Sequence, residues 1–269
     1  MDIYQKITSV YQNYPYEKRI IGKSLFGRNI YAFKVGNGTP VGVCQYAIHG
    51  REYITAELAL LHLKKGVFKG SLWILPLTNP DGALISEVGL SSVPEKERKT
   101  LLSISGSDDF SLWKANGRGV DLNVNFDAEW GKGVKNIRVP APENYIGNAP
   151  FSEPETRALK TFTEEIHPDY TVSYHTKGEE IYWYFSQSTR TCIRDKRLGT
   201  VLSVATGYPL KQTQGSVGGY KDWCILRFGI PSFTIETGKD SFSHPLGREA
   251  LDDILRRNEN ALYLLSKEM

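Results

Sequence analysis

Three short apolar runs stand out in the pattern of hydrophobic and polar positions, and each ends at a residue that can bind a metal or carry a proton. The runs cover residues 44–48, 170–174 and 231–235. Short apolar runs of this kind predict buried strands. The residues that follow them are His49, His175 and Glu236. Because ligands bind outside the carboxyl ends of strands in open α/β sheets, we expect these side chains to meet at one edge of a sheet.

The rest of the pattern alternates between strands and helices. Strand-like segments are expected at residues 23–35, 41–48 and 71–76. Helical periodicity marks residues 2–13, 54–65, 152–166, 194–206 and 248–267. Residues 79–82 (Asn-Pro-Asp-Gly) give a strong turn signal, and the mixed, polar residues 84–112 are expected to form an excursion near a cleft. This alternation predicts an α/β fold with a mostly parallel sheet covered by helices on both faces.

Length and composition indicate one ordinary globular unit. No linker, repeat or low-complexity stretch divides the 269 residues, so we expect a single domain over residues 1–269. A chain of this size buries enough surface to fold without disulfides or a structural metal. The odd number of cysteines (Cys44, Cys192 and Cys224) argues against a disulfide framework. The net charge is +3 with scattered basic residues, which indicates neither a nucleic-acid nor a membrane partner.

The ends and hydropathy of the chain bear on its location. The N-terminal stretch, MDIYQKITSVYQNYPYEKR, lacks the apolar centre of a signal peptide. No segment of the sequence approaches the roughly 20 apolar residues needed to span a membrane. We therefore expect a cytoplasmic protein.

The candidate chemistry is that of a metal-dependent hydrolase. His49 and Glu52 are three residues apart, about one helical turn, so both side chains can converge on one ion where a strand leads into a helix. With His175 they offer two imidazoles and one carboxylate, which suits catalytic zinc with one position left for water. Glu236 is placed to act as a general base. Three protein ligands and a free carboxylate are the groups that metal-assisted hydrolysis of an amide requires.

Each of these residues also has an ordinary structural interpretation. The His-x-x-Glu tetrapeptide alone fits a solvated helix start, His175 alone fits a surface histidine, and Glu236 alone fits a salt-bridged carboxylate. Their occurrence together at three strand ends favours a shared site. Nearby aromatic residues fit a cleft wall, although core packing is their ordinary interpretation. They are Tyr174, Tyr182, Trp183 and Tyr184.

Two further motifs complete a recognisable set. They are Asn79-Pro80-Asp81-Gly82 and Gly119-Val120-Asp121-Leu122-Asn123. Added to the three strand-end residues and Glu52, they resemble the zinc metallocarboxypeptidase family over most of the chain. The resemblance implies a central mixed sheet of about eight strands flanked by helices. It also implies one zinc ion held by His49, Glu52 and His175, with Glu236 as general base and acid.

Two stretches narrow the resemblance to a bacterial branch that cuts peptidoglycan peptides. They are Trp113-Lys114-Ala115-Asn116 and the segment from His175 to Trp183. This branch includes γ-D-glutamyl-diaminopimelate peptidases and murein peptide amidases. Their bond joins the side-chain carboxyl of D-glutamate to an amino group of the next residue. The resemblance therefore implies a murein peptide as substrate.

Two departures from the family pattern concern substrate binding. Carboxypeptidases of the family follow the asparagine of the Gly-Val-Asp-x-Asn run with an arginine, and the two together hold the substrate's terminal carboxylate; here Val124 follows Asn123. Valine cannot form a bidentate ion pair, which argues against ordinary C-terminal trimming. The position of the family's mobile tyrosine falls near Gln214, and Tyr220 is close enough in sequence to contribute a phenol.

The resemblance also indicates where charge can be stabilised. The family's oxyanion-stabilising arginine corresponds to Lys114, whose point charge can serve the same purpose, and Arg118 is the nearby alternative. The ordinary interpretation of Lys114 is an exposed lysine in a polar loop. Candidates for binding substrate carboxylates are Arg118, Arg138, Arg190 and Arg194.

Three other functions compete with murein hydrolysis. One is an ordinary zinc carboxypeptidase, and another is a zinc deacylase of small amino-acid conjugates, which uses the same ligand pattern on a related fold. The third is a non-catalytic binding module. Retention of both histidines, Glu52 and Glu236 argues against this last function.

Overall fold

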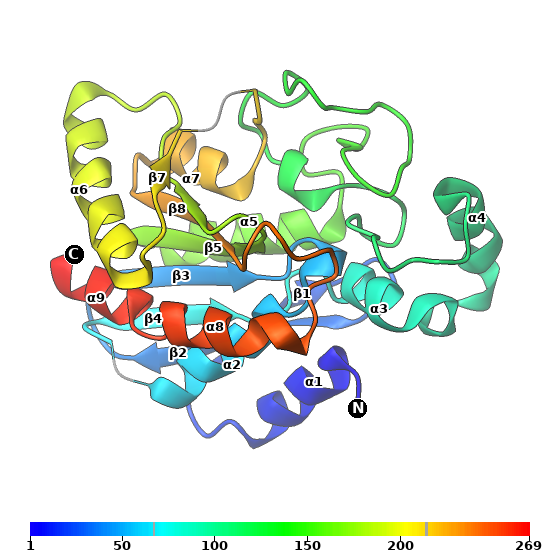
Figure 1. The fold of residues 1–269 in the computed structure, drawn as a ribbon, viewed down its shortest axis with the longest axis horizontal. Coiled ribbons are helices and arrows are strands. Elements are labelled where there is room, and N and C mark those ends of the chain that lie inside the picture. Colours follow the sequence, from blue (N-terminus) through cyan, green and yellow to red (C-terminus); the bar gives the residue numbers. More distant parts are fainter. Residues whose placement is uncertain (67, 213–214) are drawn as a thin grey trace.

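A mixed sheet of eight strands runs through the computed structural model, which describes residues 1–66, 68–212 and 215–269 (Figure 1). The strands are β1 (Lys18–Lys23), β2 (Asn29–Gly36), β3 (Val41–Tyr46), β4 (Ser71–Leu75), β5 (Tyr170–Thr176), β6 (Glu180–Tyr182), β7 (Leu210–Lys211) and β8 (Ser232–Thr237). Their order is β1-β2-β4-β3-β5-β8-β6-β7. The pairs β3–β4, β3–β5, β5–β8 and β6–β7 are parallel and the others antiparallel. The expected mixed, mostly parallel sheet is confirmed.

Helices cover both faces of this sheet (Figure 1). They are α1 (Ile3–Asn13), α2 (Thr55–Lys65), α3 (Pro80–Val88), α4 (Glu95–Ser105), α5 (Pro154–Ile166), α6 (Thr189–Thr206), α7 (Tyr220–Phe228), α8 (Arg248–Asn258) and α9 (Ala261–Glu268). On one face, Phe162 of α5 and Trp223 of α7 belong to the same buried cluster as Val43 and Trp73 of the sheet. Helices α1, α2, α6, α8 and α9 contribute to the cluster on the other face.

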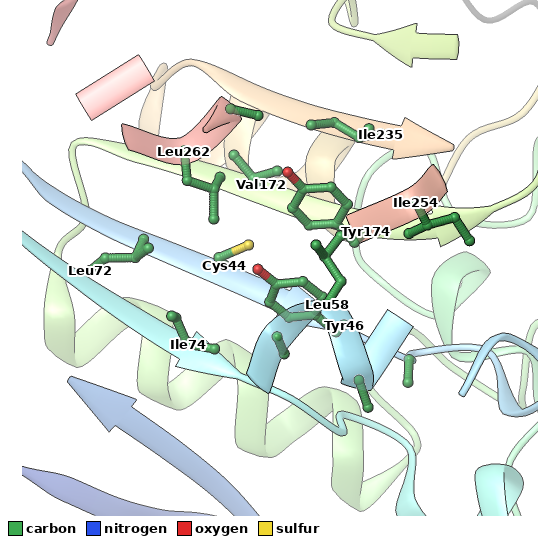
Figure 2. Close-up of a cluster of buried hydrophobic side chains, with 14 of the residues drawn as sticks. Cys44, Tyr46, Leu58, Leu72, Ile74, Val172, Tyr174, Ile235, Ile254 and Leu262 are labelled. Atoms are coloured by element: carbon green, nitrogen blue, oxygen red, sulfur yellow. The ribbon is translucent and has the colours of Figure 1, made fainter. Parts of the chain in front are cut away.

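The central strands are buried on both faces, which explains why they read as continuous apolar runs. Figure 2 shows Cys44, Leu58 and Ile254 in the cluster between the sheet and helices α2 and α8. Tyr46 of β3 and Tyr174 of β5 stack there, with ring centroids 5.0 Å apart and planes 8° from parallel. Tyr46 and Tyr174 are also register partners, so β3 and β5 run side by side to a point three residues before His49 and one residue before His175.

Several predicted boundaries differ from the structure. The turn predicted at residues 79–82 is the start of α3, because the Asn79 side chain caps the helix by accepting a hydrogen bond of 2.9 Å from Gly82 N. The polar stretch 84–112 contains α4, which packs on a small cluster with Leu101 and Trp113. The C-terminal helical region is two helices, α8 and α9, rather than one. Helix α7 and strands β1, β6 and β7 were not predicted.

Helix α6 starts earlier than predicted and ends where predicted. It begins at Thr189 because the Ser188 side chain caps it, and it stops at Gly207, which takes the left-handed conformation with φ of 74°. Within the described part of the chain, no helix is both long enough and apolar enough to cross a membrane.

Candidate functional site

The structure brings His49, Glu52 and His175 into one buried cluster. His49 follows β3, Glu52 closes a short 3₁₀ turn (Gly50–Glu52), and His175 lies in β5. The Nδ1 atoms of the two imidazoles are 3.1 Å apart, and the two Glu52 oxygens lie 2.8 Å and 3.0 Å from them. One ligand atom from each residue falls within 4.8 Å of the others, so a single ion can bind all three.

Close backbone packing holds the turn that carries two of these ligands. A Cβ on Gly50 would meet Gly82 O and lie 2.7 Å from Trp113 O, so only glycine fits there. Gly50 N also donates to Lys114 O over 2.9 Å. The Asn79 side chain donates from Nδ2 to Ile48 O and to Ala115 O, each over 3.1 Å. The Asn-Pro-Asp-Gly motif therefore joins the metal-ligand turn to the segment that carries Lys114.

Asp121 links the ligand cluster to Lys114. Its Oδ1 lies 3.2 Å from His49 Nε2, and its Oδ2 pairs with the Lys114 ammonium over 2.7 Å. Burial alone would raise the pKa of the Asp121 carboxyl, but Lys114 and His49 outweigh it and hold that pKa well below its usual range. Burial likewise lowers the pKa of Lys114, and Asp121 more than reverses the effect. Lys114 is thus a fixed positive charge beside the cluster.

Glu52 is also kept ionised. Burial raises the pKa of its carboxyl, but the charges of His49 and His175 outweigh that effect and hold the pKa well below its usual range. Two imidazole nitrogens and one buried carboxylate form a donor set that suits zinc. The Asp121 oxygen lies beside the other ring nitrogen of His49, and such a carboxylate–histidine pair typically orients a zinc ligand. The residues therefore fit zinc.

Glu236 lies on β8 directly opposite His175 on β5. On its other side it faces Glu180 of β6. Burial raises the pKa of the Glu236 carboxyl to about 7, although His175 acts in the opposite direction. A carboxyl with a pKa near 7 beside a metal cluster can both accept and donate a proton at neutral pH.

Two adjoining cavities open at this edge of the sheet. The larger has a volume of about 710 Å³ and the smaller about 220 Å³. Side chains shared by both walls are Asn123, Tyr182, Ser216 and Glu236. The larger cavity also includes His49, Arg51, Lys114, Val124 and Lys135, and the smaller includes Lys221, Asp222 and Thr234. No residue of the predicted excursion 84–112 lines either cavity, so that stretch does not form part of the cleft.

Three residues that the sequence singled out for substrate binding or charge stabilisation line the larger cavity, namely Lys114, Asn123 and Val124. Asn123 uses its side-chain oxygen to accept a hydrogen bond of 3.1 Å from Tyr220 N. Its amide nitrogen finds no acceptor among the described residues. Val124 presents an apolar side chain where an arginine would offer a charged fork.

Two residues predicted to contact the substrate, Tyr220 and Arg118, do not line the cleft. Tyr220 is fully buried and its hydroxyl lies 2.8 Å from Thr163 Oγ1, so its phenol does not reach the cleft. Arg118 pairs instead with Glu153 over 3.4 Å, outside both cavities. The other arginines proposed for carboxylates do not line them either; these are Arg138, Arg190 and Arg194. Gln214 lies outside the described residues.

Tyr182, one of the aromatic residues expected to fit a cleft wall, supplies a phenol to both cavities, and its hydroxyl donates to Glu180 Oε2 over 2.7 Å. Two other cleft residues emerge only from the fold. Arg51, inside the His-Gly-Arg-Glu motif, lines the larger cavity and pairs with Glu143 over 3.2 Å. Lys221 lines the smaller one. The sequence signal that could have identified Lys221 is the charged pair Lys221-Asp222, which lies in the first turn of a helix that is otherwise apolar on its buried side.

Comparison with known proteins agrees with this geometry. Residues 3–261 match the family model described as zinc carboxypeptidase. Gamma-D-glutamyl-L-diamino acid endopeptidase 1 of Lysinibacillus sphaericus is 30% identical over 257 residues, covering 87% of this chain and 63% of that protein. Carboxypeptidase B of Rattus norvegicus is 27% identical over 262 residues, covering 83% and 58%. The chain thus spans less than two thirds of either relative.

Solved structures share the fold. Bovine thrombin-activatable fibrinolysis inhibitor, in complex with tick carboxypeptidase inhibitor, superposes with a TM-score of 0.80 at 21% identity, covering 99% of this chain and 96% of that chain. Murein-tripeptide amidase MpaA from Escherichia coli gives a TM-score of 0.64 at 24% identity, covering 95% of each chain. The match over residues 3–261, together with the buried His-Glu-His cluster, shows that this chain belongs to the zinc carboxypeptidase family.

Proposed function

We propose that this chain hydrolyses an amide bond in peptidoglycan-derived peptides, and that the bond joins γ-D-glutamate to meso-diaminopimelate. The observation that carries the proposal is Val124, which stands beside Asn123 in the larger cavity where the family's carboxypeptidases place an arginine. Without that arginine, a terminal carboxylate loses its bidentate partner. The relative from Lysinibacillus sphaericus, named as an endopeptidase for γ-D-glutamyl-L-diamino acids, supports the same substrate class.

The proposed catalytic groups follow from the geometry of the cluster. His49, Glu52 and His175 would hold zinc, and the bound ion would supply Lewis-acid chemistry for the scissile carbonyl. Glu236 takes a proton from the attacking water and later passes it to the leaving nitrogen. Its burial suits both steps, because it raises the pKa of the carboxyl to about 7.

Lys114 is the proposed stabiliser of the oxyanion. Its ammonium lines the larger cavity and is held by Asp121 over 2.7 Å. A cation fixed before the reaction begins needs no reorganisation as negative charge develops on the carbonyl oxygen. Arg118, the alternative from the sequence, is paired with Glu153 outside the cavity. The single domain over residues 1–269 and the cytoplasmic location stay predictions from the sequence.

Substrate preference tests the proposed function. The zinc-loaded protein should cleave L-Ala-γ-D-Glu-meso-diaminopimelyl-D-Ala, whose carboxyl next to the scissile amide is itself in amide linkage, with kcat/KM about 10²-fold higher than a blocked dipeptide ending in L-phenylalanine, because Val124 cannot supply the charged hydrogen bonds that the dipeptide's carboxylate needs. Product masses identify the bond that is cut. A preference for the dipeptide would make the protein an ordinary carboxypeptidase, and turnover of N-acyl amino acids alone would make it a deacylase.

Asp121→Asn should weaken zinc binding about 10–100-fold, because a carboxylate behind a metal-bound imidazole typically contributes that much. The Asp121 oxygen lies 3.2 Å from His49 Nε2, and asparagine keeps the shape while removing the charge. Titration against a zinc chelator of known affinity measures the change. The matched control is Asp195→Asn, a fully buried carboxylate that pairs with Arg194 away from the cleft. Equal zinc affinities for both variants would remove Asp121 from the metal site.

A further inference from the structure

One residue of the Trp113–Asn116 motif has no part in the proposed mechanism. Asn116 is fully buried and lines neither cavity. It stands between Lys114 and Asp121 in the chain, the two residues of the ion pair beside the metal ligands. A buried polar side chain costs free energy unless its hydrogen bonds are satisfied, so the contacts of Asn116 indicate what it holds in place.

Asn116 closes the turn that joins these two charged residues. Its side-chain oxygen accepts hydrogen bonds from Arg118 N and Val120 N, each over 3.1 Å. Its backbone N–H donates to Val120 O over 2.8 Å, and its carbonyl oxygen accepts from the Trp113 indole over 3.1 Å. Because Asp121 follows Val120 directly, these bonds set the point at which Asp121 leaves the turn.

Two buried carboxylates at the start of α5 anchor this turn to the rest of the fold. Asn116 Nδ2 donates to Glu153 Oε2 over 2.7 Å and to Glu155 Oε2 over 3.2 Å. The other Glu155 oxygen accepts from Leu25 N over 2.9 Å. Burial raises the pKa of the Glu155 carboxyl to about 7, which reflects the cost of keeping a carboxylate there. Both amide protons of Asn116 are taken up, so its side chain cannot move without breaking bonds to α5.

We propose that Asn116 is a positioning residue, which fixes the turn so that Asp121 reaches its two partners. Those partners are His49 Nε2, 3.2 Å away, and the Lys114 ammonium, 2.7 Å away. The inference rests on the proposed function, because Lys114 is the proposed oxyanion stabiliser. A displacement of about 1 Å in a catalytic group can cost about 10²-fold in rate. Loss of Asn116 should therefore affect the metal site and the cation together.

Zinc affinity tests the proposal without any substrate. Asn116→Ala should weaken zinc binding about 10-fold, within the range expected when the carboxylate behind a metal-bound imidazole is lost. Asp121→Ala removes the side chain that Asn116 positions, so adding Asn116→Ala to it should change the zinc affinity less than about twofold. Titration against a zinc chelator of known affinity measures all three variants. A double variant that binds zinc about 10-fold more weakly than Asp121→Ala overturns the proposal.

Turnover gives a second test that a purely structural role would not satisfy. In zinc-saturated Asn116→Ala, kcat should fall about 10-fold while KM changes little, because Lys114 acts on charge that develops only in the transition state. In the Lys114→Met background the same substitution should change kcat less than about twofold, since the cation that it positions is gone. Losses in kcat that multiply in the double variant overturn the proposal.

The two tests separate this inference from the proposed function. If the wild type does not cleave the murein tetrapeptide, the proposed substrate has failed, and the zinc titrations alone decide on Asn116. If it cleaves the phenylalanine dipeptide instead, the kcat comparison is made on that substrate, because hydrolysis of either amide places negative charge on the carbonyl oxygen.

A second variant guards against misfolding. Asn116→Ala leaves Glu153 and Glu155 buried with one donor fewer each, so Asn116→Ala/Glu155→Gln neutralises one of them and lowers that penalty. Circular dichroism establishes that both variants are folded, and both should show the same losses. The control is Asn258→Ala, which removes a buried asparagine that donates to Ile254 O over 2.9 Å and lines neither cavity. It should keep the wild-type zinc affinity and kcat, and equal losses in this control overturn the proposal.

Discussion

Glu236→Gln is expected to retain its fold and its zinc and to lose about 10²–10⁴-fold in kcat, the usual contribution of a positioned acid–base group. Glutamine keeps the shape of the side chain but cannot accept a proton. The carboxyl lies opposite His175 in the sheet and lines both cavities, so it is within the site without being one of the clustered ligands. Zinc analysis and single-turnover rates on the murein tetrapeptide measure the two effects separately.

The matched control for this variant is Glu179→Gln. Glu179 pairs with Arg257 over 2.8 Å and lines neither cavity, so its replacement should leave turnover near the wild-type level.

The wild type should also lose kcat/KM as pH falls through the pKa of its base. Burial raises the pKa of Glu236 to about 7, and a bound divalent cation acts in the opposite direction, so the midpoint of the loss in kcat/KM should lie at or below about pH 7.

Near wild-type turnover in Glu236→Gln would mean that another residue is the base. The first to test would be Glu180, which accepts a hydrogen bond from Tyr182 in the cleft wall.

The ends of the central strands could be predicted from sequence because burial on both faces gives them an unmistakable apolar pattern. Because the sheet was expected to be mostly parallel, the residues at the carboxyl ends of these strands were expected at one edge, and the structure shows β3, β5 and β8 as parallel neighbours. That is how His49, His175 and Glu236 could be placed together without coordinates. Glu52 followed from its one-turn spacing to His49.

The outer parts of the cleft could not be predicted in the same way. Tyr220 and Lys221 are adjacent in sequence, yet the helix directs one side chain to Thr163 in the core and the other into the smaller cavity. Neighbouring residues on a helix point about 100° apart, so closeness in sequence did not identify the cleft residue. Arg118 was misplaced for a related reason, because its buried partner Glu153 lies 35 residues further along the chain. Such pairings depend on tertiary contacts that periodicity does not report.

Asp121 illustrates a different limit. It belonged to a motif whose residue types were recognised, but its part in the site depends on two contacts, with His49 over 3.2 Å and with Lys114 over 2.7 Å. A single carboxylate that orients a ligand and fixes a cation couples the metal cluster to the proposed oxyanion stabiliser. The motif indicates that an aspartate is needed, whereas the structure shows what it contacts.

His175→Ala should lose most of its zinc and, with it, most of its turnover. The binding free energy of zinc in protein sites of four ligands is about 10–16 kcal/mol, so an even share for one ligand is about 2.5–4 kcal/mol, or roughly 10²–10³-fold in affinity. His175 is 1% exposed and its Nδ1 lies 3.0 Å from Glu52 and 3.1 Å from the Nδ1 of His49, and no other described histidine has a ring nitrogen within 4.8 Å of both. Metal analysis after dialysis measures the loss.

The control for this variant is His167→Asn, which changes an exposed histidine at the end of α5. His167 has a φ of 49°, a left-handed conformation that asparagine adopts readily, so the replacement should leave fold and zinc unchanged. Circular dichroism of both variants separates loss of metal from loss of structure. Full zinc occupancy in a folded His175→Ala protein would mean that the third ligand is another residue. Because Glu236 faces His175 across the sheet, it would be the first residue to test in that role, and the assignment of Glu236 as the free base would have to be withdrawn with it.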